Sequence, residues 1–206
     1  MKLDDLPFNW FDIFLLVWLT MGMFRGRKRG MSEELLTFLQ WLVIVAFCST
    51  AYQPVGDMLA QITKVFSPLF SYIVGYLLAA GVVAIVFLLF KRAFHGKLIG
   101  SDAFGKAEYY LGMPAGMLRF FCMLLTGLAL LNARLYSQQE ILADQKYQKD
   151  VYGSEFFPGL QEIQANVFDQ SLSGSTIKRY LDFLLIRPTS PDGSQLLKQK
   201  EWQLKS

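Results

Sequence analysis

The chain has 206 residues, of which 53% are hydrophobic and 15% aromatic, and its formal net charge is +3. A soluble domain of this length does not need so much apolar surface for its core, so the excess indicates contact with lipid. The small net charge, with basic residues grouped beside apolar runs, argues against nucleic acid as a partner and favours lipid headgroups. Cys48 and Cys122 lie inside apolar runs, where we expect them to behave as small hydrophobic residues.

Four apolar segments follow one another in the first two thirds of the chain. They are Ile13 to Phe24, Leu35 to Gly56, Val65 to Phe90 and Tyr109 to Ala133. A helix of about 20 apolar residues crosses a hydrocarbon core of about 30 Å. No small-residue cleavage site follows the first segment, so we expect it to be retained. The sequence therefore predicts an all-α, polytopic membrane protein with four transmembrane helices, of which the first is the shortest.

The connecting segments predict the orientation. Connectors 25–34 and 91–108 are rich in lysine and arginine, whereas the connector between Gly56 and Val65 holds only Lys64. Short loops rich in these residues stay in the cytoplasm. We therefore expect both basic loops in the cytoplasm and both termini in the periplasm. The residues predicted to set the topology and to contact lipid headgroups are Arg25, Arg27, Lys28, Arg29, Lys91 and Arg92.

The composition changes after residue 133. The segment 134–206 is more polar, and Ile177, Leu181 and Leu184 follow helical spacing within it. We expect a membrane domain over residues 1–133 and a short helical extramembrane tail over 134–206. This tail would lie in the periplasm, with helices that pack on each other or rest on the membrane surface.

Two charged residues inside apolar segments are candidates for function. Arg119 lies roughly 12 Å into the fourth segment, where a charge costs about 2.5–3.5 kcal/mol and usually faces other helices. Alternatively, a helix tilted or broken at Pro114 would let Arg119 reach the cytoplasmic headgroups, which is the reading that we favour. The predicted topology places Asp12 far from Arg119 but near Arg134, so an ion pair between Asp12 and Arg134 is a further hypothesis.

Other motifs point to packing and not to chemistry. Gly112 and Gly116 have the spacing of closely packed membrane helices, usually within one chain and less often between two. The sequence contains no standard catalytic template and no set of metal ligands around its single histidine, His95. We therefore expect no catalytic residue, no metal and no cofactor, and we treat an intramembrane enzyme acting on lipid as the weakest hypothesis.

The segment from Gly26 to Leu36 resembles the signature of the CvpA family of bacterial inner-membrane proteins, which are named for colicin V production. In that family a first span beginning near an aspartate leads into Gly-x-x-Arg-Gly-x-x-x-Glu-Leu and a second span. A second family element is matched in part before the fourth segment, with Glu108 and Tyr109 where the family has Asp and Arg. The family-motif residues are Gly26, Gly30, Glu34, Glu108, Gly112, Gly116 and Arg119, and the resemblance covers residues 9–133.

This resemblance implies a small inner-membrane protein connected with toxin export and with envelope integrity. Our leading hypothesis is a non-enzymatic accessory or scaffold protein whose tail binds an envelope or secretion partner. The alternative is a subunit of a small channel or transporter that forms a homo-oligomer through the Gly112 and Gly116 face and uses Arg119 in a polar pathway.

Overall fold

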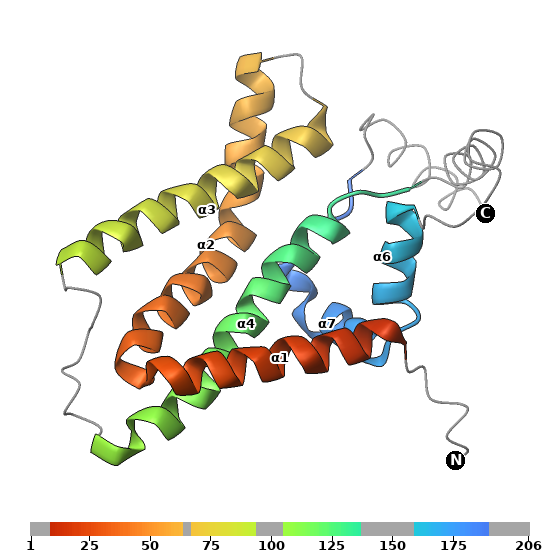
Figure 1. Ribbon diagram of the computed structural model, residues 1–206. Helices are drawn as coiled ribbons and strands as arrows, with labels where there is room; N and C mark the ends of the chain where they lie inside the picture. Colours follow the sequence, from red (N-terminus) through yellow and green to blue (C-terminus); the bar gives the residue numbers. More distant parts are fainter. Residues whose placement is uncertain (1–8, 64–66, 94–104, 137–158, 190–206) are drawn as a thin grey trace, which may run out of the picture.

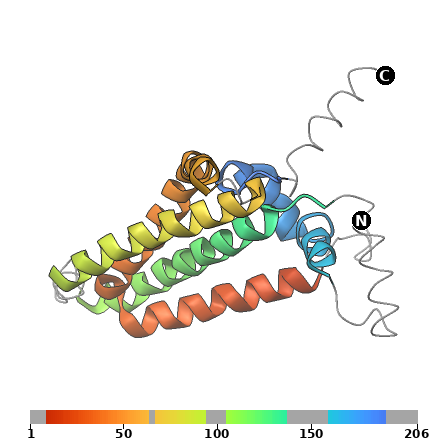
Figure 2. The same cartoon turned by 90° about the horizontal axis from the view of Figure 1, so that it is seen from above.

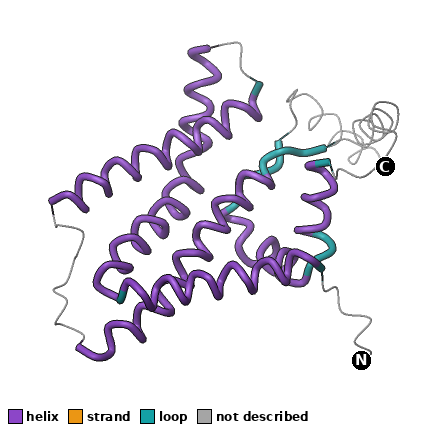
Figure 3. Tube along the Cα trace, viewed as in Figure 1, coloured by secondary structure: helices purple, strands orange, loops and turns teal. Residues whose placement is uncertain are grey.

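The computed structural model describes residues 9–63, 67–93, 105–136 and 159–189, and every regular element in these ranges is helical (Figures 1 and 3). Residues 137–158 and 190–206 of the predicted tail lie outside the described residues. The elements are α1 (Trp10–Arg29), α2 (Met31–Thr63), α3 (Pro68–Ala93), η2 (Gly105–Ala107), α4 (Glu108–Asn132), α6 (Leu160–Phe168), α7 (Leu172–Leu181) and η3 (Asp182–Leu184).

Helix α1 begins and ends at clear sequence signals. The Asn9 side chain accepts a hydrogen bond from the first turn, while the Asp12 carboxylate accepts one from the Asn9 backbone N–H, which forms a capping box. The helix continues through the basic residues that were predicted to form a loop, because arginine and lysine favour helices. It stops at Gly30, whose φ of +78° suits glycine, and α2 begins at the next residue.

The long helices pack in the order α3, α2, α4, α1 (Figure 1), and Figure 2 shows α1 on the side of α4 away from α3. Helix α2 contacts both α3 and α4, and α1 lies along the opposite side of α4. Helix α2 contains Pro54 and changes direction along its length, as a proline inside a helix explains (Figure 1).

Three of the helices are long and apolar enough to cross a membrane: Met31–Ile62, Pro68–Ala93 and Glu108–Asn132. Helix α3 exposes many large apolar side chains, as a lipid-facing helix would; they include Leu77, Val82, Ile85 and Leu89. Helix α1 is not among the three. Its charge-free part, Ile13 to Phe24, is only about 18 Å long at helical rise, so the predicted fourth span is not established by length and composition.

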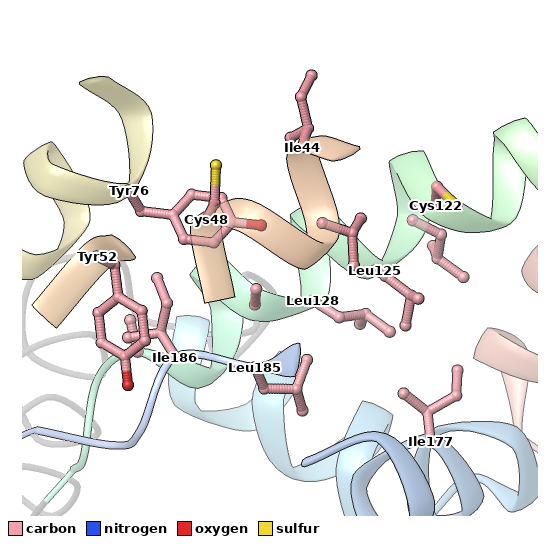
Figure 4. Close-up of a cluster of buried hydrophobic side chains, with 14 of the residues drawn as sticks. Ile44, Cys48, Tyr52, Tyr76, Cys122, Leu125, Leu128, Ile177, Leu185 and Ile186 are labelled. Atoms are coloured by element: carbon pink, nitrogen blue, oxygen red, sulfur yellow. The ribbon is translucent and has the colours of Figure 1, made fainter. Parts of the chain in front are cut away.

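The C-terminal helices share one hydrophobic core with the long helices (Figure 4). Ile177, Leu185 and Ile186 belong to the same buried cluster as Tyr52 of α2 and Leu128 of α4. The Asn132 side chain also donates a hydrogen bond of 3.0 Å to the Ile186 carbonyl oxygen. The change of composition at residue 133 therefore does not coincide with a gap in the core.

Candidate functional site: a buried polar cluster at the α1–α2 turn

A buried ion pair joins α2 to α4. Nη1 of Arg119 lies 2.6 Å from Oε1 of Glu34; the Arg119 side chain is 5% exposed and that of Glu34 is fully buried. This corrects the interpretation that Arg119 extends to the cytoplasmic headgroups. It is a helix-facing arginine whose charge is compensated inside the bundle.

The geometry of α4 explains the pairing. Arg119 lies about 16 Å along α4 from Glu108, whereas Glu34 is in the first turn of α2. Helical side chains lean toward the N-terminus of their own helix. The long arginine side chain therefore covers part of the distance along α4 that separates Arg119 from Glu34. Arg29, at the end of α1, reaches the same carboxylate from the other side, with Nη1 3.7 Å from Oε2 of Glu34.

A second buried carboxylate closes the turn between α1 and α2. Oε1 of Glu108 accepts a hydrogen bond of 2.8 Å from the backbone N–H of Ser32, one of the first-turn donors of α2 that have no partner within the helix. A Cβ atom at Gly30 would meet the Glu108 side chain. The turn, the start of α2 and the start of α4 are therefore held together by one side chain.

The predicted basic residues divide into two groups. Arg25, Arg27 and Lys28 are exposed on the last turns of α1, and Arg92 is exposed near the end of α3. Lys91 is instead partly buried and donates a hydrogen bond of 2.7 Å to Oε1 of Gln40 on α2. Lys91 therefore ties α3 to α2, a role for which its position in the sequence offered no signal.

The glycine motif is used within the chain. A Cβ atom at Gly112 would overlap Gly26, and one at Gly116 would overlap Gly22, so the backbones of α1 and α4 touch along this face. The channel hypothesis relied on this face and on Arg119, and the structure pairs Arg119 with Glu34. The face is already occupied by α1 of the same chain.

Asp12 and Arg134 are not brought together as an ion pair in the part of the chain that the structure describes. The Asp12 carboxylate accepts hydrogen bonds from the backbone N–H groups of Leu172 and Ser173 and from the Ser173 hydroxyl group. Arg134 lies over the ring of Tyr136, at 4.7 Å from its centroid. The first N–H groups of α7 lack helical partners and take the carboxylate, so the ion-pair hypothesis is replaced by a helix cap.

The polar cluster joins neighbouring helices. Each buried carboxylate has a partner on a different helix: Glu34 pairs with α4, and Glu108 with the start of α2. Sequence reasoning flagged Glu34, Glu108 and Arg119 as family-motif residues and missed Ser32, Gln40 and Ser173. Ser32 and Ser173 contribute backbone N–H groups, and Gln40 contributes its side-chain amide oxygen. No spacing pattern distinguishes such residues.

The fold and this cluster define a helical, multi-pass membrane protein whose polar residues bind its helices to each other. The family model of the colicin V production protein matches residues 11–165. The chain therefore belongs to the colicin V production (CvpA) family, and the match continues past residue 133, where the resemblance was expected to end. No curated protein and no solved structure matches the chain significantly.

Proposed function

We propose that this protein is a non-enzymatic inner-membrane scaffold that acts in envelope maintenance or in the production and export of a colicin V-type toxin. Family membership and three apolar helices of membrane-spanning length support this proposal. In the proposed arrangement α1 is a fourth membrane helix, loops 25–34 and 91–108 are cytoplasmic, and both termini are periplasmic. The periplasmic side then carries α6 and α7.

The proposed scaffold role rests mainly on one observation. The Asp12 carboxylate fixes the start of α7 against α1, while Tyr180 and Phe183 remain 68% and 70% exposed. Large aromatic side chains held in place on a docked helix are typical of binding surfaces. The proposed partner is an envelope or secretion protein that contacts these two rings.

The internal pairing of polar groups supports a structural role over a transport or catalytic one. Glu34 and Arg119 pair with each other at 2.6 Å inside the bundle, and this pairing is typical of a contact that holds two helices together. The helix face that an oligomeric channel would need is packed against α1. We therefore place the proposed binding function on the surface of the protein, at Tyr180 and Phe183, and not inside the helix bundle.

Site-specific photocrosslinking in cells tests the proposal. A photoreactive amino acid at position 180 or 183 should trap a discrete protein partner, whereas the same probe at Leu16, an exposed apolar residue of α1, should not. A double variant with serine at positions 180 and 183 should stay folded. It should maintain the cell envelope less well than the wild-type protein does. A normal phenotype in this double variant would contradict the scaffold role.

A further inference from the structure

A groove lies beside the basic end of α1 and has a volume of about 700 Å³. Its lining has two chemically distinct parts. Trp18, Met21 and Phe24 of α1 and Phe120 of α4 form apolar walls, and the remaining lining residues are cationic: Arg25, Lys28 and Arg29.

The two parts are separated along the axis of α1. Trp18 and Arg29 are about 16 Å apart at helical rise, with the apolar residues first and the cations toward the turn into α2. A phospholipid has the same order, with an anionic phosphate at the membrane surface and acyl chains toward the centre. Tryptophan, methionine and phenylalanine provide apolar contact for a chain, and arginine provides several donors for a phosphate.

The apolar wall is ordered by contacts between α1 and α4. The Trp18 indole N–H donates a hydrogen bond of 2.9 Å to the Phe120 carbonyl oxygen, and the centroids of the two rings are 5.1 Å apart. The Phe14 ring also stacks on Trp18, with 5.7 Å between the ring centroids. A ligand entering this groove would therefore meet a preformed surface and lose little free energy to ordering it.

The charges around the rim leave it positive. The neighbouring buried carboxylate is that of Glu34, which is paired at 2.6 Å with Arg119. Arg29 is 3.7 Å from the same carboxylate, and its side chain remains 41% exposed. Arg25 and Lys28 are exposed.

We propose that this groove binds one anionic glycerophospholipid, with its phosphate on Arg25 and Lys28 and an acyl chain along Trp18, Met21 and Phe120. Arg29 then links the bound phosphate to the buried Glu34–Arg119 pair, so the lipid stabilises the α1–α4 contact. This proposal goes beyond the scaffold role and does not depend on the partner at Tyr180 and Phe183.

Native mass spectrometry of the full-length protein in detergent, titrated with phosphatidylglycerol, tests the assignment. Wild-type protein should retain one phosphatidylglycerol molecule, and R25Q should weaken retention about fivefold, the effect of one cation near an anionic lipid. The matched control is R27Q. Arg27 is also exposed on α1 but faces Tyr110, at 5.8 Å from its ring centroid, so this variant should retain the lipid as the wild type does. Equal losses in R25Q and R27Q would show a diffuse basic surface and overturn the proposal.

A second pair of variants tests the acyl-chain wall without changing charge. M21W narrows the groove and should reduce lipid retention, whereas L16W, at an exposed position of α1 outside the groove, should not. Glycerol phosphate, which lacks acyl chains, should not displace the lipid. Displacement by glycerol phosphate would identify a free-phosphate site, and a dimer in place of a lipid adduct would identify a second copy as the occupant. Either outcome would refute the lipid assignment while leaving the crosslinking result intact.

Discussion

Glu34 and Arg119 form a buried ion pair between the first turn of α2 and the middle of α4, with 2.6 Å between Oε1 and Nη1. The two side chains are 5% and 0% exposed, so water does not solvate their charges and each depends on its ionic partner for its burial. Arg29 approaches the same carboxylate from the end of α1, and Glu108 binds the start of α2 nearby. Three helices of the bundle therefore meet at compensated charges.

Breaking this pair on one side should destabilise the protein strongly. Replacing Arg119 with methionine leaves the buried Glu34 carboxylate with only the longer contact to the partly exposed Arg29, at 3.7 Å, and we expect the free energy of unfolding to fall by about 3 kcal/mol. Reversible unfolding in mixed detergent measures the loss. The double variant E34M/R119M removes both charges and should recover most of it, because two apolar side chains need no partner. Additive losses in the double variant would show that the residues act independently.

The contact between α1 and α4 should also be sensitive to a single added methyl group. G26A places a Cβ atom against the Gly112 backbone, and we expect a loss of about 1–3 kcal/mol from the forced separation of the helices. The matched control is G127A in α4. A Cβ atom there meets nothing within 4 Å, so this variant should be neutral or slightly more stable. Similar losses in both variants would mean that helix backbones are not packed at Gly26.

The sequence predicted the helices better than their contacts. Uncharged length alone located α3 and α4 within a few residues, because lipid-facing helices need apolar side chains on nearly every face. The α1–α2 turn was expected to be a ten-residue loop, 25–34, but narrowed to Gly30 because the basic residues continue the helix. Charge counting identifies where a chain leaves the bilayer and not where its helix ends.

The partners of the charged residues could not be predicted for a different reason. Arg119 and Glu34 were both singled out, yet a helix tilted or broken at Pro114 was expected to let Arg119 reach the headgroups. Helix α4 instead continues through Pro114, and no spacing pattern shows that Glu34 of α2 lies beside Arg119. Asp12 was assigned to Arg134 by topology, whereas its partners at the start of α7 are mostly backbone N–H groups. Backbone donors are present at every helix start, so no residue type reveals which one a carboxylate will bind.

The Asp12 cap should control how firmly α7 is docked. D12N removes the negative charge from the N-terminus of α7, and we expect a local loss of about 1–2 kcal/mol. Hydrogen–deuterium exchange in a peptide covering residues 172–181 should become faster, with little change in α2. The control is D169N. Asp169 is 68% exposed and its ion pair with Lys178 is 3.5 Å long, so exchange should stay near the wild-type rate. Unchanged exchange in D12N would show that the apolar core holds α7 without the cap.

Cysteine labelling should determine the orientation of the protein. Both native cysteines, Cys48 and Cys122, are buried, so a single cysteine introduced at an exposed position can be labelled selectively. Positions 92 and 170 suit this purpose because both are exposed and lie at the ends of α3 and α6, respectively. With both termini in the periplasm, Q170C should react with a membrane-impermeant maleimide in intact cells, and R92C should react only after permeabilisation. The reverse pattern would invert the topology and would place the cationic groove of α1 at the periplasmic surface.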